Sequence, residues 1–285
     1  MRQTSSVLYI AVDALLPERG KSLAGFDEFT AALDHGGIPS VWLTKRSRLQ
    51  FDEPRRKLGH AHPFIAEDGC GVYLPEDYFH LRPDTAEGRS RKASTMRLGR
   101  FTCIPIAEPL PAAANALEAL SQVTGLPIVT LLSLSGRELV QNTGLPPREA
   151  ELARQRDFDE LFFFAGASQA QTERFLAAGR KRGIEFRQHG MLWSAAIGAS
   201  IQRCVAALSK LYHRALRYHA PSVAIATEDV APKLFPFCDR SLLLAGRAPE
   251  ATTDRRGYPR SREFPLKSPG VWEQVLRSVA PNLSR

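Results

Sequence analysis

Strand-length apolar runs recur along the chain and alternate with segments of helical periodicity. The first three elements are predicted as a buried strand, a helix and a second strand, at 6–13, 25–37 and 39–44. Within the helix, Phe26, Phe29 and Leu33 share one face, and two glycines end it. A strand, a helix and a strand in this order predict a βαβ unit, so we expect a parallel sheet.

Two short apolar runs follow at 63–69 and 70–75, and they predict a hairpin or two edge strands. From about Pro83 the pattern changes to a charged, small-residue stretch and then to alternating strands and amphipathic helices. Several of these helices begin at Ser or Pro and end at Gly, as helix capping favours.

The strand and helix alternation of the first segment resumes near the end of the chain, which predicts completion of the first sheet. The expected helices and strands there are 201–216, 222–227, 232–238 and 241–246. We therefore predict an inserted domain at 83–196 between two parts of a core domain, 1–82 and 197–285.

Composition and length agree with two packed domains. The chain has 285 residues, of which 44% are hydrophobic and 24% charged, and this excludes a disordered or fibrous protein. Its apolar runs are far shorter than the roughly 20 residues of a membrane helix. The first residues lack the features of a signal peptide, so we expect a cytoplasmic protein with no membrane partner. The four cysteines are far apart with no CxxC pair, which predicts buried free thiols.

The net charge of +8 favours an anionic partner, such as a phosphorylated sugar or an acidic protein surface. Basic clusters occur at 88–100 and 254–267, but neither has the interleaved aromatic residues of a single-strand binder. Nucleic acid is therefore disfavoured as a partner. Nucleotide-binding glycine motifs are also missing from the sequence, which excludes kinase and dehydrogenase classes.

Three stretches of the sequence share patterns with one family of phosphatases. Residues 43–79 contain PFIAEDG where the family has PFIxENG, and residues 132–164 contain TGL and QRDFDELF where it has TGL and QREYDEPF. Residues 268–276, SPGVWEQVL, match GPxGWxxxVL. The chain thus resembles the mannosyl-3-phosphoglycerate phosphatases of the haloacid-dehalogenase superfamily.

This resemblance implies an α/β fold, with a Rossmann-like core of parallel strands and an inserted α+β cap domain. It also implies hydrolysis of a phosphomonoester through an aspartyl-phosphate. One carboxylate at the end of the first strand attacks, and a second, two residues later, protonates the leaving oxygen. A Thr or Ser and a Lys hold the phosphoryl group, and acidic residues of a fourth motif hold Mg²⁺, which prefers oxygen ligands.

The first family motif, DxDGTLL, corresponds here to AVDALLP. If Asp13 aligns with the second carboxylate, Ala11 stands where the nucleophile belongs. If the alignment slides by two residues, Asp13 becomes the nucleophile and Leu15 takes the acid position. Both alignments stay open at this point.

The second motif is partly retained. Thr44 follows a predicted strand as the phosphate-binding hydroxyl would, and Lys45 and Arg46 come next, with Arg46 in place of the family lysine. The resemblance makes Asp13 and Thr44 candidate catalytic residues, and Lys45 and Arg46 candidate substrate ligands. A solvated turn is the alternative for Thr44.

The remaining core motifs have changed further. The family's DKGKAV is SIQRCV here, with Ile201 at the position of the phosphate-binding lysine, and GGRFYHL is HGMLWSA, with Met191 in place of the arginine. GDSPNDLPML corresponds to ATEDVAPKLF, in which Glu228 and Asp229, together with Asp13, are candidate metal ligands. Capping of the following helix is the alternative role for Glu228 and Asp229.

The QRDFDELF segment keeps most of the family pattern, although Leu161 replaces its proline. Arg156 and Glu160 are therefore candidate substrate-binding residues. A salt-bridged helix end is the alternative.

Several motifs depart from the family pattern together. Catalytic groups that act as a unit fail as a unit, so the loss of one removes most of the rate acceleration. The sequence therefore predicts a pseudophosphatase that acts by binding, scaffolding or regulation and needs no cofactor. The alternative is an active Mg²⁺-dependent sugar-phosphate phosphatase with Asp13 as the nucleophile.

Overall fold

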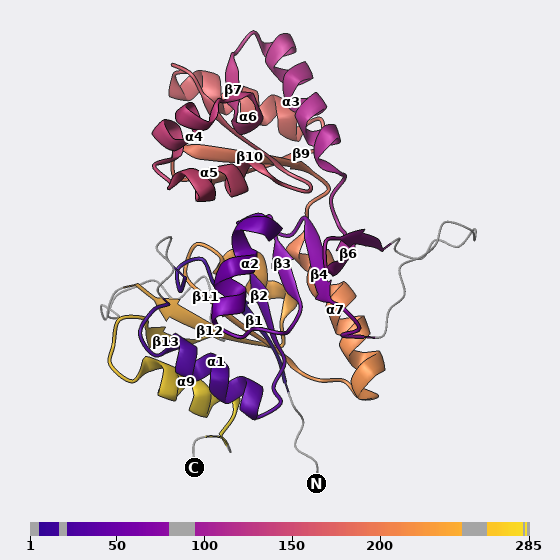
Figure 1. Ribbon diagram of the computed structural model, residues 1–285, viewed down its shortest axis with the longest axis vertical. Helices are drawn as coiled ribbons and strands as arrows, with labels where there is room; N and C mark the ends of the chain where they lie inside the picture. Colours follow the sequence, from indigo (N-terminus) through magenta and orange to yellow (C-terminus); the bar gives the residue numbers. More distant parts are fainter. Residues whose placement is uncertain (1–5, 17–21, 80–94, 247–260, 282, 284–285) are drawn as a thin grey trace, which may run out of the picture.

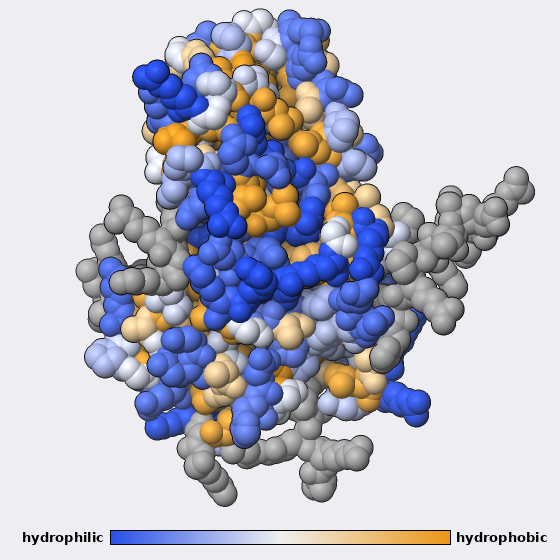
Figure 2. Space-filling view, viewed as in Figure 1, coloured by the Kyte–Doolittle hydropathy of each residue, from blue (hydrophilic) through white to orange (hydrophobic). Residues whose placement is uncertain are grey.

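The computed structural model describes residues 6–16, 22–79, 95–246, 261–281 and 283. The chain forms a larger core and a smaller cap that sits on one end of it (Figure 1). On the face drawn in Figure 2, hydrophilic side chains form a band where the cap meets the core, beside a small hydrophobic patch. Polar contacts between cap and core are therefore expected at this junction.

The core is built on one large sheet, with the strand order β13-β12-β11-β1-β2-β3-β4-β6-β5 among the described residues. Its strands are β1 (Val7–Ala11), β2 (Ser40–Leu43), β3 (Phe64–Ala66), β4 (Gly71–Pro75), β5 (Met96–Leu98), β6 (Phe101–Pro105), β11 (Ser222–Ala226), β12 (Arg240–Ala245) and β13 (Ser261–Pro265). The pairings from β13 through β3 are parallel, and those among β3, β4, β6 and β5 are antiparallel. The predicted parallel sheet and the predicted hairpin are both confirmed.

Helices cover both faces of this sheet, which is why its central strands consist of continuous apolar runs. They are α1 (Phe26–His35), α2 (Arg48–Lys57), α7 (Ile201–Leu216), α8 (Ala231–Leu234) with the 3₁₀ turn η2 (Phe235–Phe237), and α9 (Val271–Val279). Leu8 and Ile10 of β1 pack in the core cluster that includes α1 and α9. Tyr9 and Ala11 face the opposite cluster with α7 and α8. Ala11 therefore ends its strand on the α7 side of the sheet.

The cap has its own antiparallel sheet, in the order β7-β8-β10-β9. Its elements are α3 (Leu110–Thr124), β7 (Ile128–Thr130), η1 (Leu131–Ser133), α4 (Gly136–Thr143), α5 (Pro147–Arg154), β8 (Glu160–Phe164), α6 (Gln169–Arg180), β9 (Ile184–His189) and β10 (Leu192–Ile197). Ser135 and Ser168 form capping boxes at the starts of α4 and α6, as their sequences predict. The α/β core with a second, antiparallel sheet confirms the predicted fold class.

The boundary between the strands of the core sheet and those of the cap sheet does not lie at residue 83. β5 and β6 fall within the predicted 83–196 insertion, yet both belong to the core sheet. The chain enters the cap after Pro105, where Glu108 N donates to the Ile197 carbonyl at 2.9 Å. A change of composition marks a connecting segment as readily as a domain boundary. The boundaries 1–82, 83–196 and 197–285 stay a prediction, and the strand pairing favours a later start for the cap.

Three further expectations concern single features. Cys70, Cys103 and Cys204 are buried free thiols, whereas Cys238 is free and half-buried. Within the described ranges, every helix is too short or too polar to cross a membrane. Much of the basic clusters at 88–100 and 254–267 lies outside the described residues.

Candidate functional site

A small cavity lies at the carboxyl ends of β1 and β2, the edge of a parallel sheet where ligands usually bind. Its volume of about 10 Å³ gives room for roughly one water molecule. The residues of its lining that matter here are Ala11, Asp13, Thr44, Asp68, Ile201 and Val230. Asp13 and Thr44, both predicted from the sequence, therefore lie together in the structure. Ala11 and Ile201 lie beside them in the lining of the cavity.

Ala11 is the last residue of β1, in register with Leu43 of β2. The family nucleophile belongs at the end of this strand, so the geometry favours the alignment with Ala11 at that position. The Ala11 methyl group has no lone pair with which to attack phosphorus. Under that alignment Asp13 would take the place of the second carboxylate, and its role stays a prediction.

Asp13 is held by its protein neighbours. Thr44 Oγ1 donates to Asp13 Oδ1 at 2.6 Å, and Lys45 N donates to Oδ2 at 2.8 Å. Arg46 Nε lies 3.8 Å from Oδ1. Burial raises the pKa of Asp13, and these three neighbours oppose that rise. Both carboxylate oxygens are thus engaged before any ligand is considered.

The two basic residues after Thr44 point in different directions. The Arg46 guanidinium donates to the Leu16 carbonyl and lies beside Asp13, so it is turned toward the protein. The Lys45 side chain is exposed, while its carbonyl accepts from Arg156 at 2.7 Å. Their predicted roles as substrate ligands stay predictions.

Ile201, which the sequence resemblance aligns with the family lysine, is the first residue of α7 and is buried. It packs in the apolar cluster on the α7 side of the sheet. Ser200, its N-cap, donates its amide to the Gly69 carbonyl at 3.0 Å. This contact joins the start of α7 to the β3–β4 turn.

Glu228 and Asp229 follow β11, and each accepts a hydrogen bond from the protein. Glu228 Oε1 accepts from Gly246 N at 3.1 Å, and Asp229 Oδ1 accepts from Thr227 Oγ1 at 2.6 Å. The alternative role, capping of the following helix, is not observed, because the N-cap of α8 is Val230 and no side chain caps it.

Known proteins resemble this chain in sequence over part of its length. No family model matches it. A glucosyl-3-phosphoglycerate/mannosyl-3-phosphoglycerate phosphatase of Methanococcoides burtonii is 25% identical over 178 residues, which are 62% of this chain and 61% of the relative. A mannosyl-3-phosphoglycerate phosphatase of Pyrococcus horikoshii is 24% identical over 127 residues, covering 45% and 47%. The chain thus spans less than two thirds of the length of these curated relatives.

Solved structures match the chain over nearly its whole length. A haloacid dehalogenase-like hydrolase from Bacteroides thetaiotaomicron has a TM-score of 0.62 at 13% identity, covering 96% of this chain and 99% of that one. The chain has the haloacid-dehalogenase fold. A sugar phosphatase of subclass IIB of that superfamily agrees, with a TM-score of 0.60 at 12% identity over 96% and 98% of the two chains. The resemblance predicted from the sequence is confirmed.

Phosphatases with the haloacid-dehalogenase fold generally use Mg²⁺. The positions of the predicted Mg²⁺ ligands in this chain can therefore be compared with what the ion requires. Asp13, Glu228 and Asp229 form no converging set: among the described residues, three potential ligand atoms lie within 4.8 Å of one another only at Glu67, Cys70 and Asp159. Mg²⁺ is commonly held by one or two carboxylates together with water, so a cluster of three side chains is not required. The assignment of Asp13, Glu228 and Asp229 as metal ligands stays a prediction.

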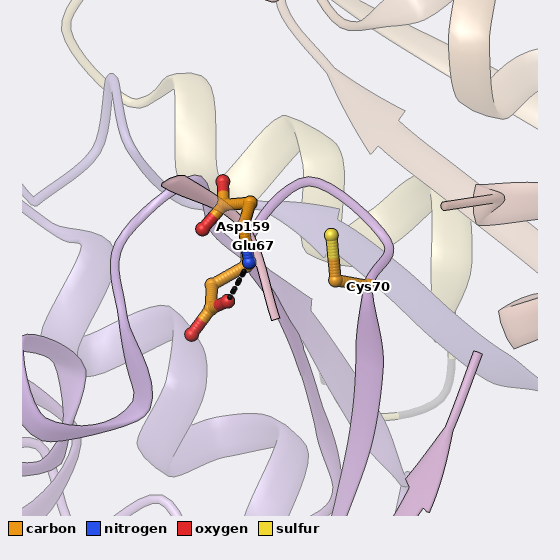
Figure 3. A group of neighbouring side chains, drawn as sticks. All are labelled: Glu67, Cys70 and Asp159. Atoms are coloured by element: carbon orange, nitrogen blue, oxygen red, sulfur yellow. Dashed lines mark hydrogen bonds between the residues drawn. The ribbon is translucent and has the colours of Figure 1, made fainter. Parts of the chain in front are cut away.

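The group of Glu67, Cys70 and Asp159 is drawn in Figure 3. The Glu67 carboxylate points at the cap backbone and accepts three amides, from Asp157, Phe158 and Asp159, at 2.9, 2.9 and 3.1 Å. Burial and the negative charge of Asp159 raise the pKa of Glu67 to about 8. Burial also raises the pKa of the Cys70 thiol. These groups have protein partners and join the core hairpin to the cap.

Arg156 and Glu160 lie inside this haloacid-dehalogenase fold and away from the cavity. The Arg156 side chain is 3% exposed and donates to Asp159 and to the Lys45 carbonyl. Glu160 is 2% exposed on β8, and burial raises its pKa to about 7. Their assignment as substrate ligands stays a prediction, and these contacts favour an internal structural role.

One pair of charged residues between core and cap was not predicted from the sequence. Asp68, in the β3–β4 turn, lies with Oδ2 3.1 Å from Nε2 of His189 on β9. Burial opposes ionisation of Asp68, but His189, Arg187 and Lys233 together lower its pKa to about 2. The sequence signal was that the resemblance aligns Asp68 with the Asn of PFIxENG and His189 with the first Gly of GGRFYHL.

Proposed function

We propose that this chain is a catalytically degenerate relative of the mannosyl-3-phosphoglycerate phosphatases, a pseudophosphatase that binds an anionic ligand or a protein partner and leaves it unhydrolysed. The observation that carries the proposal is Ala11 at the end of β1, beside the cavity. Without a nucleophile at that point, no aspartyl-phosphate forms there. A phosphorylated sugar as ligand and a cytoplasmic location are parts of this proposal.

The surroundings of Ala11 support the same conclusion. Ile201 supplies an alkyl side chain where a cation would offset the negative charge of a phosphoryl group. Both residues line the same small cavity, of about 10 Å³. A phosphatase mechanism at this point would therefore lack its nucleophile and the cation that holds the phosphoryl group.

The alternative is an active Mg²⁺-dependent sugar-phosphate phosphatase that uses Asp13 as nucleophile. One contact favours it, because Thr44 Oγ1 and Asp13 Oδ1 are 2.6 Å apart at the strand ends. Against it, both oxygens of Asp13 already accept hydrogen bonds from the protein.

Phosphate release separates the two functions. We expect the wild type and Asp13→Asn to release no phosphate above background from mannosyl-3-phosphoglycerate or a panel of sugar phosphates with Mg²⁺. The missing nucleophile is the reason, and circular dichroism checks that both proteins are folded. Turnover by the wild type that Asp13→Asn abolishes would overturn the pseudophosphatase and make Asp13 catalytic.

A further inference from the structure

Asp68 stands between the core cavity and the cap. It lines the cavity, and its carboxylate makes an ion pair with His189 across the junction. Its backbone has a φ of 52°, in the left-handed region that Asp adopts more readily than most residues. The contact with His189 places its carboxylate.

Strand β9 presents its basic residues toward the core. Ile184 and Phe186 pack in the apolar cluster between the cap sheet and its helices α3 and α6. Side chains alternate between the two faces of a strand, so Arg187 and His189 project from the opposite face. Ser194 pairs with Arg187 in register, and its Oγ lies 3.3 Å from His189 Nε2. These residues thus form one polar patch on the face of the cap sheet that is not covered by α3 and α6.

One charged atom in this region lacks a hydrogen bond. Arg187 Nη1 is buried without a hydrogen-bond partner within the described structure, whereas Asp68 Oδ2 has its ion pair with His189. Arg187 is close enough to help lower the pKa of Asp68, but the two side chains form no direct ion pair. A buried charged group without a partner is costly, and such groups in native proteins usually have a ligand or a role.

We propose that Arg187 and His189 form an oxyanion-binding site for the carboxylate or phosphate group of a small ligand. In this structure the Asp68 carboxylate takes the place of that oxyanion. The inference rests on the proposed function, because it says how a chain without the family's motif arginine would hold an anion. Arg187 and His189 lie outside the positions at which that motif has its arginine and histidine.

The chemistry of the donors fits an oxyanion. A guanidinium and an imidazole N–H are both suited to carboxylate and phosphate oxygens, and the guanidinium can hold two of them at once. Asp68 opposes such a ligand in two ways, since its negative charge repels the ligand and its side chain contacts His189. Removing the charge of Arg187 and removing the charge of Asp68 should therefore change affinity in opposite directions.

Isothermal titration calorimetry with inorganic phosphate and with glycerate tests the site in the full chain. We expect at least one of these anions to bind. Arg187→Gln should weaken its binding about tenfold or more, because a charge-assisted hydrogen bond is lost. Asp68→Asn should tighten it roughly three- to tenfold, because a nearby like charge is removed. The charge-matched control, Arg182→Gln, alters an exposed residue just before β9 and should leave the affinity unchanged.

Several outcomes overturn the site. These are equal affinities in the wild type and Arg187→Gln, weaker binding in Asp68→Asn, or no binding of either anion to the wild type and to Asp68→Asn. Phosphate without glycerate binding identifies a phosphate ligand, and the reverse identifies a carboxylate, so both results support the site. The absence of anion binding would not contradict the proposed pseudophosphatase function, because that function is tested separately by phosphate release.

Discussion

Glu160 shows how burial alters one carboxyl group in the cap. The side chain is 2% exposed, and its Oε2 is buried without a hydrogen-bond partner in the described structure. Burial raises its pKa from 4.5 to about 7. The folded state therefore binds the proton more tightly than the unfolded chain does. The stability that this proton binding contributes is full below pH 4.5 and is lost as the pH rises through about 7.

Glu160→Gln should remove this part of the pH dependence, because the amide does not ionise. Thermal unfolding of the wild type and the variant should give melting temperatures that differ little at pH 4.5 and diverge by pH 8, with the variant more stable. The matched control is Glu118→Gln on the exposed side of α3. A variant that loses stability with pH as steeply as the wild type would contradict the raised pKa of Glu160.

The predictable part of the site consisted of residues inside recognisable motifs. Ala11, Asp13, Thr44 and Ile201 were all expected at one place, and all four line the same cavity. The contact of Asp68 with His189 could not be predicted, because it joins distant parts of the sequence through the docking of the cap. Charged residues usually lie on a solvated surface, so neither residue taken alone predicts a buried contact.

The β3–β4 turn is an element whose conformation depends on one glycine. Gly69 has a φ of 96°, and a Cβ there would lie 2.8 Å from Ile201 N. Gly69→Ala should therefore destabilise the fold by roughly 2–3 kcal/mol through backbone strain and a clash with α7. Urea unfolding measures this loss. Gly246→Ala is the control, since that glycine has no positive φ and a Cβ added there would meet no atom within 4 Å, and equal losses in the two variants would contradict the argument.

Helices and strands were predictable where the spacing of apolar residues within the segment determines the secondary structure. The helix expected at 201–216 is α7, and the apolar runs at 63–75 form the hairpin of β3 and β4. The sheet to which β6 belongs was not predictable, because an apolar strand of this length pairs equally well with either sheet. Its hydrogen bonds to β4 decide the matter, and they depend on the tertiary arrangement.

At the scale of the whole molecule, Glu67 connects the core to the cap. It accepts three successive backbone amides of the cap segment, and Asp157 of that segment is held in turn by Arg48 and Tyr73 of the core. Buried amides without an acceptor are costly, so this side chain contributes strongly to the attachment of the cap to the core.

Glu67→Ala should loosen that connection. We expect hydrogen exchange at the amides of 157–159 to accelerate by at least about tenfold, because their acceptor is gone and the segment opens more often. Exchange in β1 serves as an internal reference, and Glu118→Gln serves as the surface control. Unchanged protection of the 157–159 amides would show that other contacts hold the cap.

The position of β1 has a consequence for the synthesis of the chain. This central strand lies between β2 and β11, and β11 begins at Ser222, after every strand of the cap sheet. A ribosome therefore completes the cap before it delivers the second neighbour of β1. Closure of the core sheet is a late, long-range step, and the entropy of closing so large a loop makes such a step slow.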